Sequence, residues 1–132
     1  MSLGTRRDDA VARRFEMNGH VSWFEVLGSD ADRLVAFYAE LFGWKLVRMP
    51  DMEYHTTAPD WTGVPGGVGK APEGPGWTTF YVNVDDVEAA IARATAQGGK
   101  VMMPKTDLPG GTTIAVVADP EGHPIGLAHS AK

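Results

Sequence analysis

The sequence places one carboxylate among apolar side chains, that of Glu25 in the run Trp23-Phe24-Glu25-Val26. A carboxylate in apolar surroundings is a candidate general base. Simple alternation along a strand, with polar residues on one face, explains the same pattern equally well. Glu25 is therefore the leading candidate for chemistry, and a polar strand face is the alternative.

The remaining residue types restrict the chemistry further. The chain has no cysteine, so a metal site would need His, Asp or Glu. The four histidines, at positions 20, 55, 123 and 129, show no Hxxx(E/H) spacing. The run Gly66-Gly67-Val68-Gly69 lacks the helix and the Lys-Ser/Thr of a phosphate loop, and its glycines indicate a kinked strand or a close backbone approach. Trp61, in a Pro/Gly-rich loop, is a candidate lid.

Composition excludes several function classes. The 132 residues include 43% hydrophobic and 22% charged residues, which predicts one compact domain or two very small modules that share a core. A formal net charge of -5 argues against non-specific nucleic-acid binding. No apolar run approaches the roughly 20 residues that span a bilayer, so we expect a soluble, cytoplasmic protein without membrane contact. Residues 1–19 form a charged N-terminal tail that has the pattern of a short helix over residues 8–17.

Two halves of the chain repeat one order of elements. In the first half a strand over 21–26 precedes a helix over 31–42, whose apolar residues fall at helical spacing and which ends at Gly43. Strands near 44–49, 53–57 and 64–70 follow. In the second half a strand over 78–84 precedes a helix capped by Asp85 or Asp86, and the later strands are 100–103, stopped by Pro104, and the hairpin 112–117 and 123–129.

The predicted fold is therefore α+β. It consists of two β-α-β-β-β modules, 20–72 and 77–129, in a single domain over 20–131. The hairpin turn Asp119-Pro120-Glu121-Gly122 joins the last two strands, and the return strand presents Gly126 and Ala128 on a nearly bare face that leaves room for a ligand.

Several motifs together resemble the glyoxalase, bleomycin-resistance and extradiol-dioxygenase superfamily, also called the vicinal oxygen chelate proteins. They are Trp23-Phe24-Glu25-Val26, the run 36–44 (Ala-Phe-Tyr-Ala-Glu-Leu-Phe-Gly-Trp), Phe80 to Asp86 and Ala118-Asp119-Pro120-Glu121-Gly122. The resemblance covers about 21–129. It implies a cupped mixed sheet with helices on the convex face, a ligand in the hollow, and a homodimer.

The resemblance also implies where a ligand would bind. Metal-using members take ligands from the first and last strands of each module, and the corresponding positions here hold Val21, Thr79, Gly67 and Gly126, none of which is a metal ligand. We therefore expect no catalytic metal. Strand phase adds Trp23, Glu25, Tyr81 and Asn83 to the hollow, so the predicted ligand-binding residues are Val21, Trp23, Glu25, Gly67, Thr79, Tyr81, Asn83 and Gly126.

Two functions follow. The first is a small-molecule-binding protein, without cofactor, that encloses an aromatic or apolar ligand between Trp23 and Tyr81, with Glu25 and Asn83 as polar anchors. The alternative is an enzyme, a glyoxalase-like lyase or isomerase or a dioxygenase, that uses a divalent metal or Glu25 as general base. A structural or partner-binding module would give no reason for an open hollow.

Overall fold

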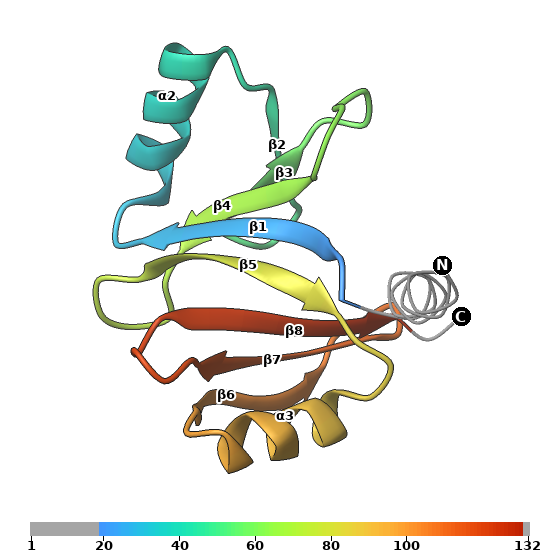
Figure 1. Ribbon diagram of the computed structural model, residues 1–132. Helices are drawn as coiled ribbons and strands as arrows, with labels where there is room; N and C mark the ends of the chain where they lie inside the picture. The colour runs from blue at the N-terminus through green and yellow to red at the C-terminus, as the bar shows by residue number, and fades with distance from the viewer. Residues whose placement is uncertain (1–18, 131–132) are drawn as a thin grey trace, which may run out of the picture. The chain divides into compact units, whose positions relative to one another are not determined.

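The computed structural model describes residues 19–130 and contains two helices and eight strands (Figure 1). The first module consists of β1 (Val21–Gly28), α2 (Ala31–Phe42), β2 (Leu46–Arg48), β3 (Tyr54–Thr57) and β4 (Gly66–Lys70). The second consists of β5 (Trp77–Asn83), α3 (Val87–Ala96), β6 (Lys100–Asp107), β7 (Thr112–Ala118) and β8 (Pro124–Ser130). The predicted α+β class and the two β-α-β-β-β modules are confirmed. The predicted tail helix lies outside the described residues.

The described residues group into two compact units. Ser22–Tyr81 form one, called here the N-terminal unit, and residues 19–21 with 82–130 form the other, the C-terminal unit. The boundary falls inside β5. The first five residues of this strand therefore belong to the N-terminal unit, although β5 is the first strand of the second module. Parallel and antiparallel pairing are mixed among the strands, because β1 pairs with β4 in parallel and the other pairs described here are antiparallel.

In the N-terminal unit the hydrogen-bonded strand order is β2-β3-β4-β1-β5, and α2 packs against β4. The helix begins where the Asp30 carboxylate accepts a hydrogen bond from the Arg33 N–H at 3.1 Å. It ends at Gly43, whose φ of 72° is the left-handed conformation that glycine adopts at least cost. The predicted helix bounds and the role of Gly43 are confirmed.

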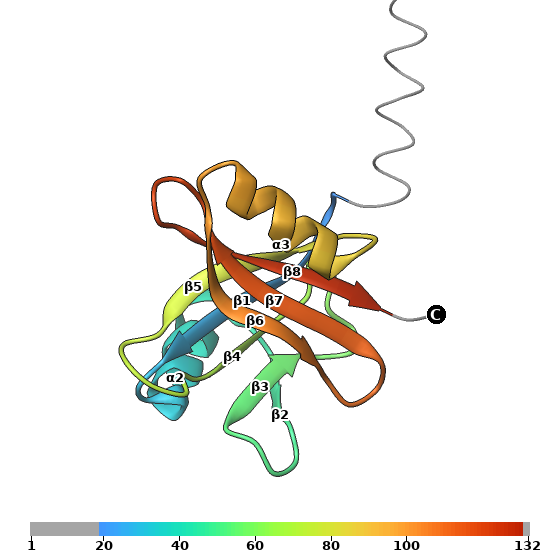
Figure 2. The ribbon, with the colours of Figure 1, turned by 90° about the horizontal axis from the view of Figure 1, so that it is seen from below.

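The C-terminal unit places α3 against β6, β7 and β8, as Figures 1 and 2 show. Its core consists of small and branched apolar side chains: Val84, Val87, Ala90, Ala115, Val117 and Leu127. Strands β7 and β8 pair in antiparallel fashion throughout their length, and Gly122 in the connecting turn has a φ of 94°. The predicted hairpin is therefore confirmed.

The predicted end of β6 is wrong. Pro104 does not stop β6, which continues to Asp107 with register shifts on both sides of Met103. β6 is the last strand in the order β8-β7-β6 and therefore has a neighbouring strand on one side only. A proline is tolerated in such an edge strand because the N–H that it lacks would face the side without a neighbour.

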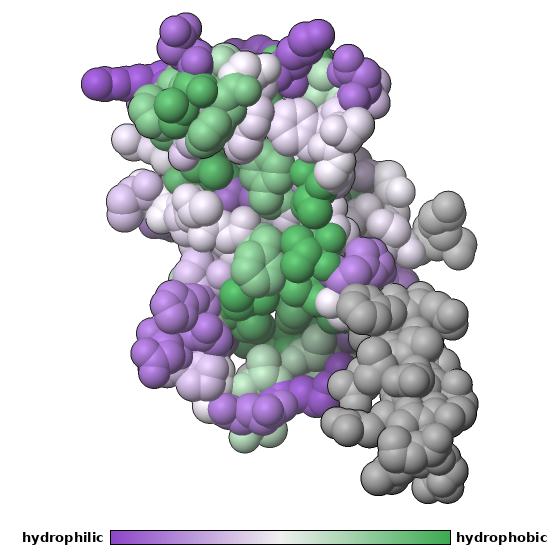
Figure 3. Space-filling model, turned by 45° about the horizontal axis from the view of Figure 1, so that its top comes forward, coloured by the Kyte–Doolittle hydropathy of each residue, from purple (hydrophilic) through white to green (hydrophobic). Residues whose placement is uncertain are grey.

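The apolar stripe of α2 is more exposed than its pattern predicts. Ala31 is the one buried residue of this helix, and Phe37, Leu41 and Phe42 are each 56% exposed. Figure 3 shows apolar side chains at the surface in the region of α2. Within residues 19–130 neither helix is long and apolar enough to cross a membrane.

Candidate functional site

Glu25 lies in the middle of β1, between β4 and β5, and its side chain is half-buried. Because successive side chains of a strand point to opposite faces, Phe24 and Glu25 lie on opposite faces of the sheet. The Phe24 ring packs beside Trp44 and Trp61, with ring centroids 5.3 and 6.2 Å apart. Glu25 faces the opposite side of the sheet of the N-terminal unit.

On that side both carboxylate oxygens of Glu25 accept hydrogen bonds from aromatic side chains. The Tyr54 hydroxyl donates to Oε2 at 3.0 Å, and the Tyr81 hydroxyl donates to Oε1 at 3.0 Å. The Trp77 indole Nε1 is a longer donor to Oε1 at 3.5 Å. The Trp23 indole completes the network by donating to the Tyr54 oxygen at 2.9 Å. We call these five residues the Glu25 cluster.

The two phenols of the Glu25 cluster stay protonated at neutral pH. Burial, and then the negative charge of Glu25, raise the pKa of both Tyr54 and Tyr81 well above the ordinary value. Each hydroxyl is therefore a neutral donor whose proton points at the carboxylate. The arrangement holds one half-buried carboxylate in a fixed orientation by neutral donors alone.

Glycines in β4 make this arrangement possible. Glu25 pairs in register with Gly67, and Tyr54 on β3 pairs with Gly69. A Cβ atom at either glycine would overlap the Tyr54 ring, so the absence of side chains lets this ring lie across β4 and reach β1. Gly66 makes the same room for the Phe24 ring on the other face. The prediction for this run was a kinked strand or a close backbone approach; at Gly66 and Gly67 the atoms that approach are those of neighbouring aromatic side chains.

Four of the predicted site residues come together in the N-terminal unit. Trp23, Glu25 and Tyr81 belong to one hydrogen-bond network, and Gly67 makes room for it. Thr79 is 6% exposed and belongs to the same strand as Tyr81. The roles of these residues in binding stay predictions.

The other three predicted residues belong to the C-terminal unit. Val21 is 42% exposed at the start of β1. Asn83 bonds through its backbone to His20, at 2.9 Å, and to Gly19. Gly126 is buried in β8 opposite Val116. Their predicted part in binding stays untested.

Sequence reasoning missed Tyr54 and Trp77. Trp77 shares the alternation of Thr79 and Tyr81, but the predicted strand began one residue later, at Thr78. Tyr54 fell within a predicted strand of unknown phase. The signal for it was the glycine run of β4, because a strand without side chains accommodates an aromatic ring from its neighbour.

The described residues do not fit the divalent metal centre of metal-using relatives. Within residues 19–130 no group of three or more His, Cys, Asp or Glu side chains converges. The oxygens beside Glu25 belong to neutral phenols, which are weaker ligands for a divalent metal than carboxylates or imidazoles.

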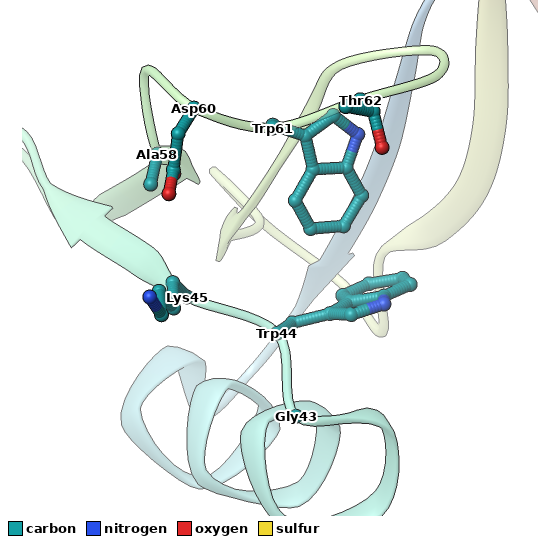
Figure 4. Close-up of a pocket in the computed structure, with 7 residues that line it drawn as sticks. All are labelled: Gly43, Trp44, Lys45, Ala58, Asp60, Trp61 and Thr62. Atoms are coloured by element: carbon teal, nitrogen blue, oxygen red, sulfur yellow. The ribbon is translucent and has the colours of Figure 1, made fainter.

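A separate pocket of about 380 Å³ lies at the end of α2 (Figure 4). It is lined by Gly43, Trp44, Lys45, Ala58, Asp60, Trp61 and Thr62. The Trp61 ring meets Trp44 edge to face at 5.3 Å, and its Nε1 donates to the Val64 carbonyl at 3.0 Å. Because Trp61 packs with Phe24 and Trp44, it lies on the face opposite Glu25, and its predicted role as a lid over the ligand is wrong.

Comparison with known proteins agrees with the fold. A family model described as the glyoxalase/bleomycin resistance protein/dioxygenase superfamily matches residues 20–127. This match covers most of the chain, so the protein belongs to that superfamily. The resemblance inferred from the sequence motifs is confirmed.

Named relatives span several activities. The chain is 31% identical over 131 residues to the putative glyoxylase CFP32 of Mycobacterium tuberculosis, covering 83% of this chain and 45% of the relative. It is 35% identical over 112 residues to a probable chloroplastic lactoylglutathione lyase of Arabidopsis thaliana, covering 74% and 32%. The chain thus spans less than half the length of these two relatives.

A solved structure supports the fold alone. A superfamily member from Vibrio splendidus 12B01 superposes with a TM-score of 0.59 at 19% identity, covering 85% of this chain and 99% of that one.

Proposed function

We propose that this protein binds a small aromatic or apolar organic molecule at the Glu25 cluster, with the carboxylate as polar anchor and the aromatic side chains as walls. The observation that carries the proposal is the half-buried carboxylate held on both oxygens by neutral donors. A carboxylate has about four acceptor positions. The three donors described above leave room for a donor from a ligand.

Pre-organisation favours binding at this position. Tyr54 is fixed both by its bond to Glu25 and by the bond it accepts from Trp23, so the ligand would not have to order these side chains. Rigid aromatic side chains supply large contact areas at a low entropy cost. The proposal includes binding without a metal, because the donor set beside Glu25 does not suit one.

Catalysis is the second candidate function. It is supported by the names of relatives, among them a probable lactoylglutathione lyase, and by Glu25 as a candidate general base. The hydrogen bonds on both oxygens weigh against it, since donors already hold three of the carboxylate's about four acceptor positions and leave one for a proton. A turnover assay with lactoylglutathione separates the two: conversion that disappears in Glu25→Gln would favour the lyase.

The proposal is tested by a screen of small aromatic compounds with ligand-observed NMR. Hits are then titrated into wild type, Glu25→Gln and Glu40→Gln. Glu40 is an exposed residue of α2 and provides a matched control for the same change of charge. A hydrogen bond to a charged group contributes about 1.5–3 kcal/mol. We therefore expect Glu25→Gln to weaken binding at least tenfold and Glu40→Gln to leave it unchanged.

Two outcomes contradict the proposal. Equal affinities in wild type and Glu25→Gln would remove Glu25 from the site. A screen without Glu25-dependent hits, on protein whose circular dichroism shows a folded chain, would remove small-molecule binding at this cluster altogether.

A further inference from the structure

The negative charge of Glu25 has no cationic partner in the described part of the chain. The ion-pair contacts described within residues 19–130 join Lys105 with Glu88 and, when its imidazole is protonated, His123 with Asp119, and neither involves Glu25. The donors to Glu25 are two phenols and an indole, all neutral groups. They orient and stabilise the carboxylate, but none of them carries a positive charge that would neutralise it.

This uncompensated charge lies in aromatic surroundings. Glu25 is half-buried and therefore less hydrated than a surface carboxylate, which strengthens its attraction for an opposite charge. Four aromatic side chains, Trp23, Tyr54, Trp77 and Tyr81, surround it through direct or relayed hydrogen bonds. Aromatic groups attract cations through their quadrupoles, and tryptophan does so most strongly.

We infer that the molecule bound at the Glu25 cluster is an organic cation, a protonated or quaternary amine attached to an apolar body. This inference rests on the proposed function and adds the charge of the ligand to it. A neutral ligand would leave the half-buried carboxylate uncompensated, and an anionic ligand would be repelled by it. An ammonium group meets both the carboxylate and the aromatic rings, while its apolar body covers the indoles.

Choline and 3,3-dimethylbutan-1-ol test the charge directly, since they have nearly the same shape and differ in the quaternary nitrogen. Each is titrated into the full chain, with binding followed by the indole N–H signals in a ¹H–¹⁵N NMR spectrum. The four tryptophans provide an internal control, because Trp23 and Trp77 belong to the Glu25 cluster and Trp44 and Trp61 line the separate pocket.

We expect choline to shift the signals of Trp23 and Trp77, to leave those of Trp44 and Trp61 in place, and to bind at least tenfold more tightly than the neutral alcohol. The preference should disappear in Glu25→Gln and persist in Glu40→Gln. Higher salt should weaken choline binding to the wild type more than it weakens binding of the alcohol.

Equal binding of choline and the alcohol would overturn the inference, as would choline shifts confined to Trp44 and Trp61. Both measurements use the wild-type chain, so they hold even if a variant does not fold. If neutral aromatic compounds bind at Trp23 and Trp77 in a Glu25-dependent way while choline does not, the cation is refuted and the proposed function stands. If neither class binds there, both fail.

Discussion

Substitution of Gly67 by alanine should destabilise the N-terminal unit, although alanine is ordinarily the better residue in a strand. The backbone of Gly67 has no left-handed φ, so replacing glycine would by itself stabilise the strand by about 0.5–1 kcal/mol. A Cβ at this position, however, overlaps the Tyr54 hydroxyl and ring. The ring must move, and its hydrogen bonds to Glu25 and from Trp23 are lost.

The lost bonds outweigh the gain. A hydrogen bond to a charged group contributes about 1.5–3 kcal/mol and a neutral one about 0.5–1.5 kcal/mol. Because Tyr54 and Glu25 are half-buried, water replaces part of both bonds, and the lower ends of these ranges apply. Subtracting the gain in strand propensity, we expect a net loss of about 1–1.5 kcal/mol in the free energy of unfolding.

Urea unfolding followed by tryptophan fluorescence measures this loss, since all four tryptophans lie in the N-terminal unit. A double-mutant cycle identifies the cause: Gly67→Ala in a Tyr54→Ala background should be neutral or stabilising. Gly66→Ala is the matched control, because its Cβ would overlap Phe24 on the opposite face and Tyr54→Ala should not rescue it. Two results would refute displacement of the Tyr54 ring as the cause: a higher free energy of unfolding in Gly67→Ala than in wild type, or an equal loss of that free energy when Gly67→Ala is introduced into Tyr54→Ala.

Four further predictions test other parts of the account. The raised pKa values of Tyr54 and Tyr81 favour the folded state below the ordinary tyrosine pKa of 10.0, so stability should fall as pH rises above that value. Urea unfolding between pH 8 and 11 should show a shallower fall in the Tyr54→Phe/Tyr81→Phe variant, and equal slopes would contradict the assignment. Trp61→Ala should leave ligand affinity at the Glu25 cluster unchanged, as titration of a screened hit would show; a large loss would restore Trp61 as a lid. We propose a homodimer that uses the exposed apolar face of α2, so Leu41→Glu should halve the mass measured by sedimentation equilibrium, and an unchanged mass would exclude this face. Hydrogen bonds from backbone N–H groups, above all that of His123, lower the pKa of the Asp119 carboxyl below 3.8. An NMR pH titration should show this lowered pKa, and a value at or above 3.8 would refute it.

Local chemistry was sufficient to predict the elements of the fold. Asp30 and Gly43 delimit α2 as their capping preferences predict, and Gly122 makes the predicted hairpin turn. Strand alternation also put Trp23, Glu25 and Tyr81 on one face, because side-chain period is a property of each strand alone. Pro104 was misjudged because an edge strand tolerates a residue that an inner strand does not.

The position of Tyr54 in the site depends on the register between neighbouring strands, which no local sequence pattern predicts. Tyr54 reaches Glu25 only because β3 and β4 pair with Tyr54 opposite Gly69, and β4 and β1 pair with Gly67 opposite Glu25. A shift of one residue in either pairing would turn Tyr54 to the other face. Trp77 was missed for a simpler reason, a strand boundary placed one residue too late.

A crystal structure of the protein with the tightest-binding small molecule from the screen would show whether the ligand contacts Glu25. We expect a donor or cationic group of the ligand to lie within hydrogen-bond or ion-pair distance of a Glu25 carboxylate oxygen, with the apolar body of the ligand against Trp23 or Trp77. A ligand bound instead between Trp44 and Trp61, or in the C-terminal unit, with Glu25 untouched, would contradict it.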